Sequence, residues 1–301
     1  MRAEMSQPSS VTGDLLNIRN ILIATDFSEY SARALDHALE IAARYEARLH
    51  LFHCIDPTLY NLAGPDAVQM ACDAAWRDMQ QLVSDLRIKG LAKNVELKLL
   101  VESGALATIL PAIVQRLDLG LIVVGTHGRT GWRKLVLGSV AEIVIRQASC
   151  PVLTVGPCDR GLRLQKFGLK SIVFVNDASA QSALAESYAF SLAHKWSSRL
   201  TILRVLEEQS GRVLAEASQI ERCGAEWTDV VLEKGLTSAP QLPTGVGSRG
   251  DLILQVADEA AADLIVLAVR DAYSFTDRFR STYGYQVVRC SPCPVLTVRD
   301  Q

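Results

Sequence analysis

Three glycines and a serine follow one apolar run of the sequence and could hold phosphate. Residues 121–124 (LIVV) end at Gly125, and Gly128, Gly138 and Ser139 follow after two and then nine intervening residues. Backbone N–H groups approach an anion closely where no Cβ intervenes, and a helix expected from Val140 adds the donors of its first turn. The spacing therefore predicts a phosphate-binding loop. The alternative is a turn that serves only chain geometry.

A carboxylate follows another apolar run. Residues 21–25 read ILIAT, Asp26 comes next, and Ser28 precedes a helical spacing of apolar residues. A carboxylate just past a strand could accept from a ribose hydroxyl or an adenine amino group. Alternatively, Asp26 caps the following helix together with Ser28. Arg129 and Arg133 could add positive charge beside a phosphate, with solvated loop arginines as the alternative.

Histidines and cysteines suggest metal or redox chemistry less strongly. His50 and His53 lie three apart on an expected strand and should face opposite sides of the sheet, which disfavours a shared metal even with His127 in the loop. Cys290 and Cys293 have a redox-like spacing, but the pair is expected to end a helix, whereas a reactive thiol usually lies at a helix start. We assign no metal ligands and interpret these cysteines as structural.

These residues lie at the ends of alternating strands and helices. The expected strands are 21–25, 48–55, 95–101, 121–124 and 152–155; the expected helices run from Ser28 to Ala42, through Met70, Trp76, Met79, Val83 and Leu86, and over 107–117 and 140–147. Such alternation is typical of a mainly parallel sheet covered on both faces.

The same order then begins again. Residues 171–184 align with 20–33 and place Asp177 where Asp26 stands, and CPVLTV occurs at 150–155 and at 293–298. We therefore predict an α/β protein of two tandem, mainly parallel open-sheet domains with helices on both faces. The expected boundaries are a tail over 1–16, a first domain over 17–157, a linker over 158–165 and a second domain over 166–301.

On these motifs the chain resembles a tandem member of the universal stress protein family (UspA-type). The resemblance covers both halves, and the glycines and serine match the family's nucleotide-binding motif without a gap. It implies a Rossmann-like fold of the adenine-nucleotide alpha-hydrolase type, ATP with Mg²⁺ or Mn²⁺ as ligand, and a stress-response role with a regulatory protein partner. It also implies contacts at the residues that match the family pocket, namely Ala24, Thr25, Asp26, Cys54, Val124, Gly125, Gly128, Arg129, Gly138, Ser139 and Val140.

The second copy departs from this motif. An offset of 143 places Ala268, Asp271, Ser281 and Thr282 where the first copy has its glycines and serine. Side chains there would crowd phosphate, so we expect one nucleotide per chain, in the first domain. Because the fold is repeated without the glycines, we also expect them to serve a ligand rather than the fold.

Composition limits the other function classes. The chain has 301 residues, 49% of them apolar, and a net charge of −2, which gives no electrostatic footprint for nucleic acid. No run is long enough to span a membrane, the first 16 residues do not read as a signal peptide, and seven cysteines in mostly apolar segments fit a reducing compartment. We expect a cytoplasmic protein without nucleic-acid binding or membrane insertion.

Catalysis is not evident in the sequence. The first domain offers no Walker lysine and no adjacent acidic pair after a strand, so no catalytic residue is assigned and a binding protein is favoured. The alternatives are a slow ATPase or nucleotidyl-transfer enzyme, and a nucleotide-independent scaffold with an apolar-ligand pocket in the second domain. The final strands of the two copies, 152–155 and 295–298, are expected edges that pair internally, and a homodimer of chains is a further possibility.

Overall fold

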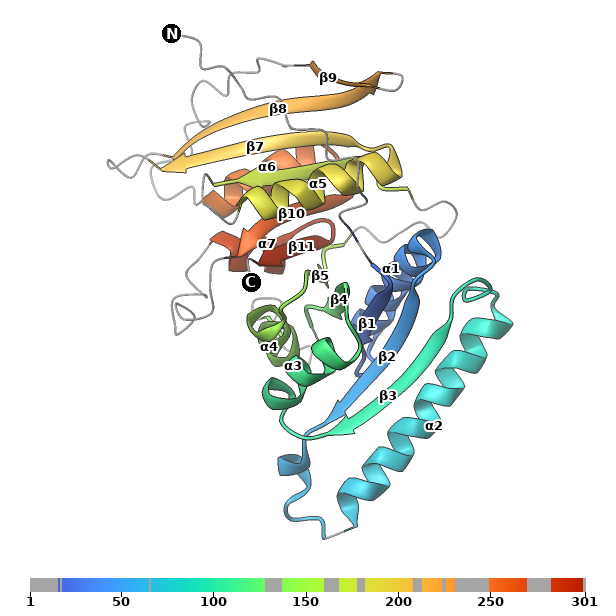
Figure 1. The fold of residues 1–301 in the computed structure, drawn as a ribbon. Coiled ribbons are helices and arrows are strands. Elements are labelled where there is room, and N and C mark those ends of the chain that lie inside the picture. The colour runs from blue at the N-terminus through green and yellow to red at the C-terminus, as the bar shows by residue number, and fades with distance from the viewer. Residues whose placement is uncertain are drawn as a thin grey trace.

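The computed structural model describes residue 16 and residues 18–64, 66–127, 137–159, 168–177, 182–207, 213–223, 226–230, 249–269 and 283–299. The two halves of the chain lie one above the other and meet at their final strands, as Figure 1 shows. Within the described residues, no helix combines the length and the apolarity needed to cross a membrane.

The first half confirms the predicted order of strands and helices. Its elements are β1 (Asn20–Ala24), α1 (Glu29–Tyr45), β2 (Arg48–Ile55), the 3-10 turn η1 (Pro57–Tyr60), α2 (Ala67–Ile88), β3 (Leu97–Ser103), α3 (Leu106–Arg116), β4 (Leu121–Gly125), α4 (Ser139–Gln147) and β5 (Val152–Val155). The helix after the glycine loop begins at Ser139, one residue earlier than predicted, so the serine belongs to the helix.

Helix α1 shows how the sequence sets its own boundaries. The Ser28 hydroxyl caps the helix by accepting the N–H of Ser31 at 3.2 Å. Glu46 ends it in the left-handed conformation with φ of 53°. Apolar residues three or four apart face the core between these ends, namely Ala34, Leu35, Ala38, Leu39 and Ala42.

The second half repeats the beginning and the end of this order but differs in the middle. Its elements are β6 (Ser171–Asn176), α5 (Ser182–Trp196), β7 (Arg199–Glu207), β8 (Val213–Cys223), β9 (Glu226–Val230), α6 (Arg249–Glu259), β10 (Leu264–Val269), α7 (Tyr283–Cys290) and β11 (Val295–Arg299). Two antiparallel strands, β8 and β9, follow β7 where the first half continues with α2 and β3.

All strands join one open sheet of eleven strands in the order β3-β2-β1-β4-β5-β11-β10-β6-β7-β8-β9. The domains meet where β5 and β11 pair in antiparallel fashion, with Leu153 opposite Leu296. The Thr154 hydroxyl donates to the Val295 carbonyl at 3.1 Å, and the Thr297 hydroxyl donates to the Val152 carbonyl at 3.2 Å. The expected pairing of the two final strands is therefore confirmed.

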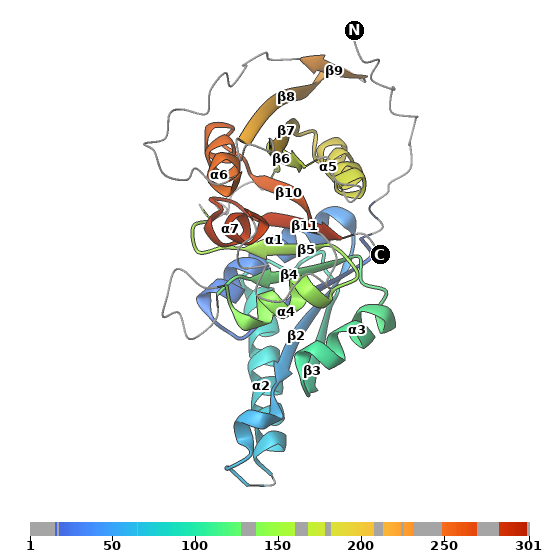
Figure 2. The same ribbon diagram turned by 90° about the vertical axis from the view of Figure 1, so that its left-hand side faces the viewer.

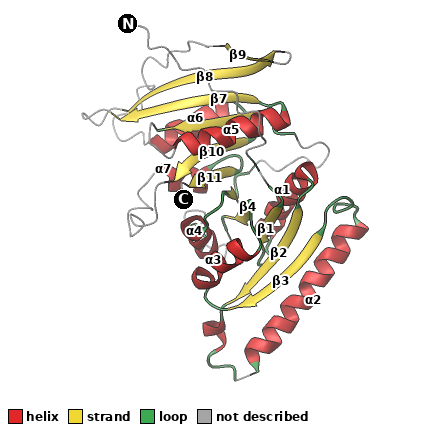
Figure 3. Cartoon of the chain, viewed as in Figure 1, coloured by secondary structure: helices red, strands yellow, loops and turns green. Residues whose placement is uncertain are grey.

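Helices cover both faces of the sheet, which confirms the predicted fold class (Figures 2 and 3). One buried cluster unites residues of α3, α4, α6 and α7 on one face, and the other unites residues of α1, α2 and α5 on the opposite face. Buried strands of this kind are long apolar runs because neither face meets water.

Helix α2 forms as predicted, but two of the apolar residues that predicted it are not in the core. Met70 is 68% exposed and Trp76 is 42% exposed, whereas Ala75, Met79 and Leu86 are buried. The reason is the place of α2, which packs on β2 and on the edge strand β3. A helix beside an edge strand has less sheet to cover, so fewer of its apolar side chains become buried.

Candidate functional site

The predicted site lies at the carboxyl ends of β1 and β4. These strands are parallel neighbours, and their register sets Ala24 beside Val124. Asp26, two residues beyond Ala24, and Gly125, one beyond Val124, consequently leave the sheet at the same edge. The strand order turns here, since β2 lies on one side of β1 and β4 on the other. Open parallel sheets bind ligands at such a switch point.

The turn between β1 and α1 holds Asp26 in a fixed position. The N–H of Ser28 donates to Asp26 Oδ1 at 3.0 Å, and the N–H of Phe27 donates to Thr25 Oγ1 at 3.0 Å. Phe27 has φ of 62°, unusual for a residue with a side chain. His53 donates to the Thr25 carbonyl at 2.7 Å from the neighbouring strand. Asp26 thus takes part in the turn that begins α1, which is the alternative that the sequence left open. The same turn fixes the direction of its carboxylate.

The predicted pocket wall comes from one face of the sheet. Ala24, Cys54 and Val124 lie on β1, β2 and β4 and all contact the cluster that packs against α3 and α4. The Cys54 thiol donates to the Gly104 carbonyl at 3.4 Å. Burial, followed by the nearby Asp56 and Glu102, raises the pKa of Cys54 to about 11. A thiol held protonated in this way suits a wall and not a nucleophile.

The connection from β4 to α4 is described at its two ends. The N–H of Gly138 donates to the Thr126 carbonyl at 2.7 Å, which brings the end of the loop back to its beginning. Gly128 and Arg129 lie outside the described residues. Gly125, Gly138 and Ser139 are therefore gathered at one edge of the sheet.

Both described glycines also have a packing role. A Cβ on Gly125 would lie 3.0 Å from the carbonyl oxygen of Tyr30, and a Cβ on Gly138 would lie 3.2 Å from that of Thr126. These approaches are tighter than ordinary side-chain contacts. A side chain at either position would require the neighbouring backbone to shift by a few tenths of an ångström, so the expectation that the glycines serve a ligand rather than the fold stays a prediction.

The start of α4 offers donors. Gly138 is its N-cap and supplies no side-chain cap, and the Glu142 N–H donates to the Gly138 carbonyl at 2.9 Å. The N–H groups of the first turn consequently have no partner within the helix itself. Val140 is 43% exposed beside them. This end of α4 has the polarity that binds an anion.

His127 lies between the two ends of the loop. It is 8% exposed, its Nδ1 lies 3.0 Å from the Thr126 hydroxyl, and its ring packs 5.5 Å from that of Tyr30. Burial lowers its pKa, so the neutral imidazole is favoured. It serves here as an anchor for the start of the loop.

The other histidines and cysteines behave as structural groups. His50 Nε2 lies 3.3 Å from Asn20 Oδ1, on the face opposite to His53. Cys290 ends α7 and Cys293 precedes β11, as predicted. Six cysteines with described side chains are free. In the described part of the chain, no group of three His, Cys, Asp or Glu side chains could hold a metal ion.

In the second domain a tyrosine reaches the carboxylate that corresponds to Asp26. Asp177 Oδ2 accepts the hydroxyl of Tyr283 at 2.9 Å, and Oδ1 accepts that of Ser182 at 2.7 Å. Tyr283 corresponds to Val140 at the offset of 143. The predicted second-copy residues Asp271, Ser281 and Thr282 lie outside the described residues. Asp177, the counterpart of Asp26, thus receives its hydrogen bonds from the chain itself. From the sequence, only the offset of 143 could have indicated Tyr283 as its partner.

A second tyrosine in the same turn of α7 crosses to the first domain. The N–H of Leu137 donates to the Tyr285 hydroxyl at 3.2 Å, and both residues are buried. Leu137 immediately precedes Gly138, so the second domain fixes one end of the glycine loop. No local sequence pattern indicates this contact, because it joins residues 148 positions apart.

Comparison with known proteins extends the likeness to both halves. The Universal stress protein family matches residues 17–156 and again residues 168–299. Universal stress protein MJ0531 of Methanocaldococcus jannaschii is 30% identical over 145 residues, which cover 46% of this chain and 81% of that protein. The crystal structure of a universal stress protein from Archaeoglobus fulgidus superposes with a TM-score of 0.65 and 17% identity, covering 94% of this chain and 99% of that one.

Nucleotide binding is known among the relatives. A universal stress protein solved in complex with cAMP is 25% identical over 46% of this chain and 96% of its own length, with a TM-score of 0.35. At that level of likeness nothing about the site of the present chain follows from it.

Proposed function

The chain belongs to the universal stress protein family, and on that premise we propose that its first domain binds ATP and regulates a stress response in the cytoplasm. The nucleotide occupies the edge formed by the ends of β1 and β4 and the start of α4. Mg²⁺ or Mn²⁺ accompanies the triphosphate.

One observation carries the proposal. The register of β1 with β4 brings Asp26 and the glycine loop to one edge of the sheet, although 99 positions separate Asp26 from Gly125. The proposal therefore has a carboxylate and a set of backbone donors at the ends of two adjacent strands. The carboxylate suits ribose hydroxyls or the adenine amino group, and the donors suit phosphate oxygens. Ala24, Cys54 and Val124 provide an apolar wall between them.

The second domain gives a reason to expect only one nucleotide per chain. Tyr283 supplies to Asp177 the hydroxyl that a ribose would supply to Asp26. Displacing it would cost a charge-assisted hydrogen bond, a stronger interaction than a neutral one. We therefore assign the second domain to pairing and to support of the first.

Binding without efficient turnover is the activity we propose. The Cys54 thiol is held protonated, and none of the described groups at this edge has a position that we can assign to activating a water molecule. ATP occupancy would act by fixing the glycine loop and the surface around it, which a regulatory protein could read.

The test is a calorimetric titration of the whole chain with ATP and Mg²⁺. Wild type should bind one equivalent. Asp26→Asn keeps an oxygen for the Ser28 N–H while removing the charge, and it should weaken binding by about tenfold, because a hydrogen bond to a charged group contributes roughly 1.5 to 3 kcal/mol. Asp177→Asn is the matched control in the second domain and should bind as wild type does.

Two results would contradict the proposal. Absence of saturable ATP binding by the folded wild type would remove it, and two equivalent sites would contradict the role given to Tyr283. Single-turnover hydrolysis faster than that of free ATP and lost in Asp26→Asn would instead favour a slow ATPase.

A further inference from the structure

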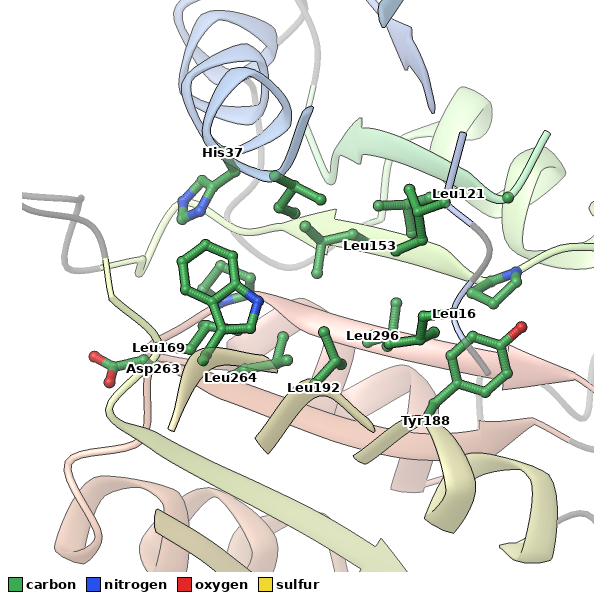
Figure 4. Close-up of a pocket in the computed structure, with 16 residues that line it drawn as sticks. Leu16, His37, Leu121, Leu153, Leu169, Tyr188, Leu192, Asp263, Leu264 and Leu296 are labelled. Carbon is green, nitrogen blue, oxygen red and sulfur yellow. The ribbon is translucent and has the colours of Figure 1, made fainter. Parts of the chain in front are cut away.

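An apolar cavity lies at the junction of the two domains, away from the glycine loop. Its floor is formed by leucines of four adjacent strands, Leu121 of β4, Leu153 of β5, Leu296 of β11 and Leu264 of β10. Leu153 and Leu296 are register partners across the domain boundary. Figure 4 shows these side chains converging on one space from both domains. The empty volume is about 530 Å³, counting the open mouth.

The cavity lies on the approximate twofold axis that relates the domains. Leu121 and Leu264, like Leu153 and Leu296, are equivalent residues at the offset of 143. Ile41 of α1 and Leu192 of α5 line it as equivalents at the offset of 151. Neither domain alone could form it, so the cavity is a property of the tandem chain.

Cationic and aromatic side chains tie the two roof helices together. Arg44 of α1 lies 5.3 Å from the ring of Trp196 on α5, and Lys195 lies 5.2 Å from the ring of Tyr45. Arg44 also donates to the Lys195 carbonyl at 2.8 Å. These contacts join the C-terminal ends of α1 and α5.

Among the described lining residues, the side chains with polar atoms are those of His37, Tyr188, Trp196 and Asp263. His37 and Tyr188 lie at opposite ends of the cavity in Figure 4 and are themselves equivalent residues. His37 Nε2 lies 2.9 Å from the Asp159 carboxylate, and both side chains are buried. Asp263 accepts the N–H groups of Lys170 and Ser171 at 2.7 and 2.9 Å. Both carboxylates are therefore held by the chain itself.

Tyr188 differs from these groups. It is half-buried, and burial followed by the nearby Cys150 raises its pKa, so its hydroxyl stays protonated. In the part of the chain that the structure describes, this hydroxyl has no hydrogen-bond partner. It is available as a donor at one end of an otherwise apolar space.

We propose that this cavity binds a small uncharged aliphatic molecule that carries a single hydroxyl or carbonyl group. The side chains that surround this space are mostly apolar, so it suits an apolar occupant better than ordered water, which needs several polar partners. A charged head group would lose its hydration without gaining a partner, and an anion would also meet the two carboxylates near the rim. Tyr188 donates to the oxygen of the ligand, and the leucines contact its chain.

The test is a calorimetric titration of the full chain with octanol, octanoate and octylamine. Octanol should bind saturably with one equivalent, and the two charged compounds at least tenfold more weakly. Leu192→Trp fills the cavity from α5 and should weaken octanol binding at least tenfold. His194→Trp adds the same bulk on the exposed side of the same helix and should bind as wild type does.

A second, more conservative variant tests the proposal in case Leu192→Trp does not fold. Tyr188→Phe keeps the ring and removes the donor, and it should weaken octanol binding about threefold or more while circular dichroism stays unchanged. The proposal is overturned if wild type shows no saturable octanol binding, if octanoate binds as tightly as octanol, or if folded Leu192→Trp binds octanol undiminished. Because the cavity shares no residue with the ATP site, ATP binding by the same samples is an independent result.

Discussion

Replacing Tyr285 with phenylalanine removes the contact by which the second domain reaches the glycine loop. The hydroxyl accepts the N–H of Leu137 at 3.2 Å, and Leu137 is 2% exposed while Tyr285 is 6% exposed. The substitution keeps the ring in place and leaves a buried N–H without this acceptor. Such a loss costs about 1 to 3 kcal/mol, against a total stability of roughly 5 to 15 kcal/mol for ordinary domains. The variant should therefore fold and be measurably less stable.

ATP affinity should fall by more than a general loss of stability would cause. Leu137 adjoins Gly138, so a relaxed Leu137 displaces the end of the loop that ATP binding must restore. If 1 kcal/mol of the cost appears in binding, ATP affinity falls about fivefold. Urea unfolding measures the first quantity and calorimetry the second.

Tyr283→Phe is the matched control for this experiment. It removes the other hydroxyl of the same helical turn, the one bonded to Asp177, and should lower stability without changing ATP affinity. The reasoning is refuted if Tyr285→Phe loses stability but binds ATP within twofold of wild type, or if both variants lose affinity equally.

Three further substitutions test single features of the fold. Burial lowers the pKa of His127 in the folded protein, so the unfolded chain binds a proton at this histidine first as pH falls below about 6.5. The free energy of unfolding of wild type should therefore fall between about pH 7.5 and 5.5. In urea titrations at each pH, His127→Asn should show a smaller fall, by at most about 1.4 kcal/mol per pH unit. Gly125→Ala should cost about 1 to 3 kcal/mol in urea unfolding because its Cβ would lie 3.0 Å from a backbone carbonyl, whereas Gly156→Ala, whose nearest neighbour would lie at 3.7 Å, should cost clearly less; equal losses would contradict the packing argument. Asp159→Ala should destabilise the protein by about 1 to 3 kcal/mol because it leaves His37 buried without this partner, and a melting temperature equal to that of wild type would count against any role for the pair.

Much of the fold could be predicted because its signals are local or repeated. Ser28 and the apolar spacing after it predict α1, and the recurrence of CPVLTV predicts the tandem organisation. The pairing of β5 with β11 is expected because an unpaired edge strand is a liability and because the family resemblance implies pairing at this strand.

The features that escaped prediction depend on tertiary contacts. Met70 and Trp76 fit the helical period but lie beside an edge strand, where the sheet is too narrow to bury them. The repeat offered no guide to β8 and β9, because the first copy continues with α2 and β3 where these strands occur. Tyr283 and Tyr285 follow each other at alternate positions and reach different domains, which no local pattern could indicate.

The glycines show why a repeated copy is an imperfect control for function. The second copy has Ala268 in place of Gly125, which suggests that the fold tolerates a side chain at this position. In the first copy, however, the backbone of Tyr30 lies so close that a Cβ would meet its carbonyl oxygen. Tyr30 follows closely on the turn that carries Asp26, so in the proposed site its close approach to Gly125 would also bring the Asp26 carboxylate near the end of β4. Packing and binding are therefore not alternative explanations for Gly125: the absence of its side chain lets the two halves of the proposed site come together.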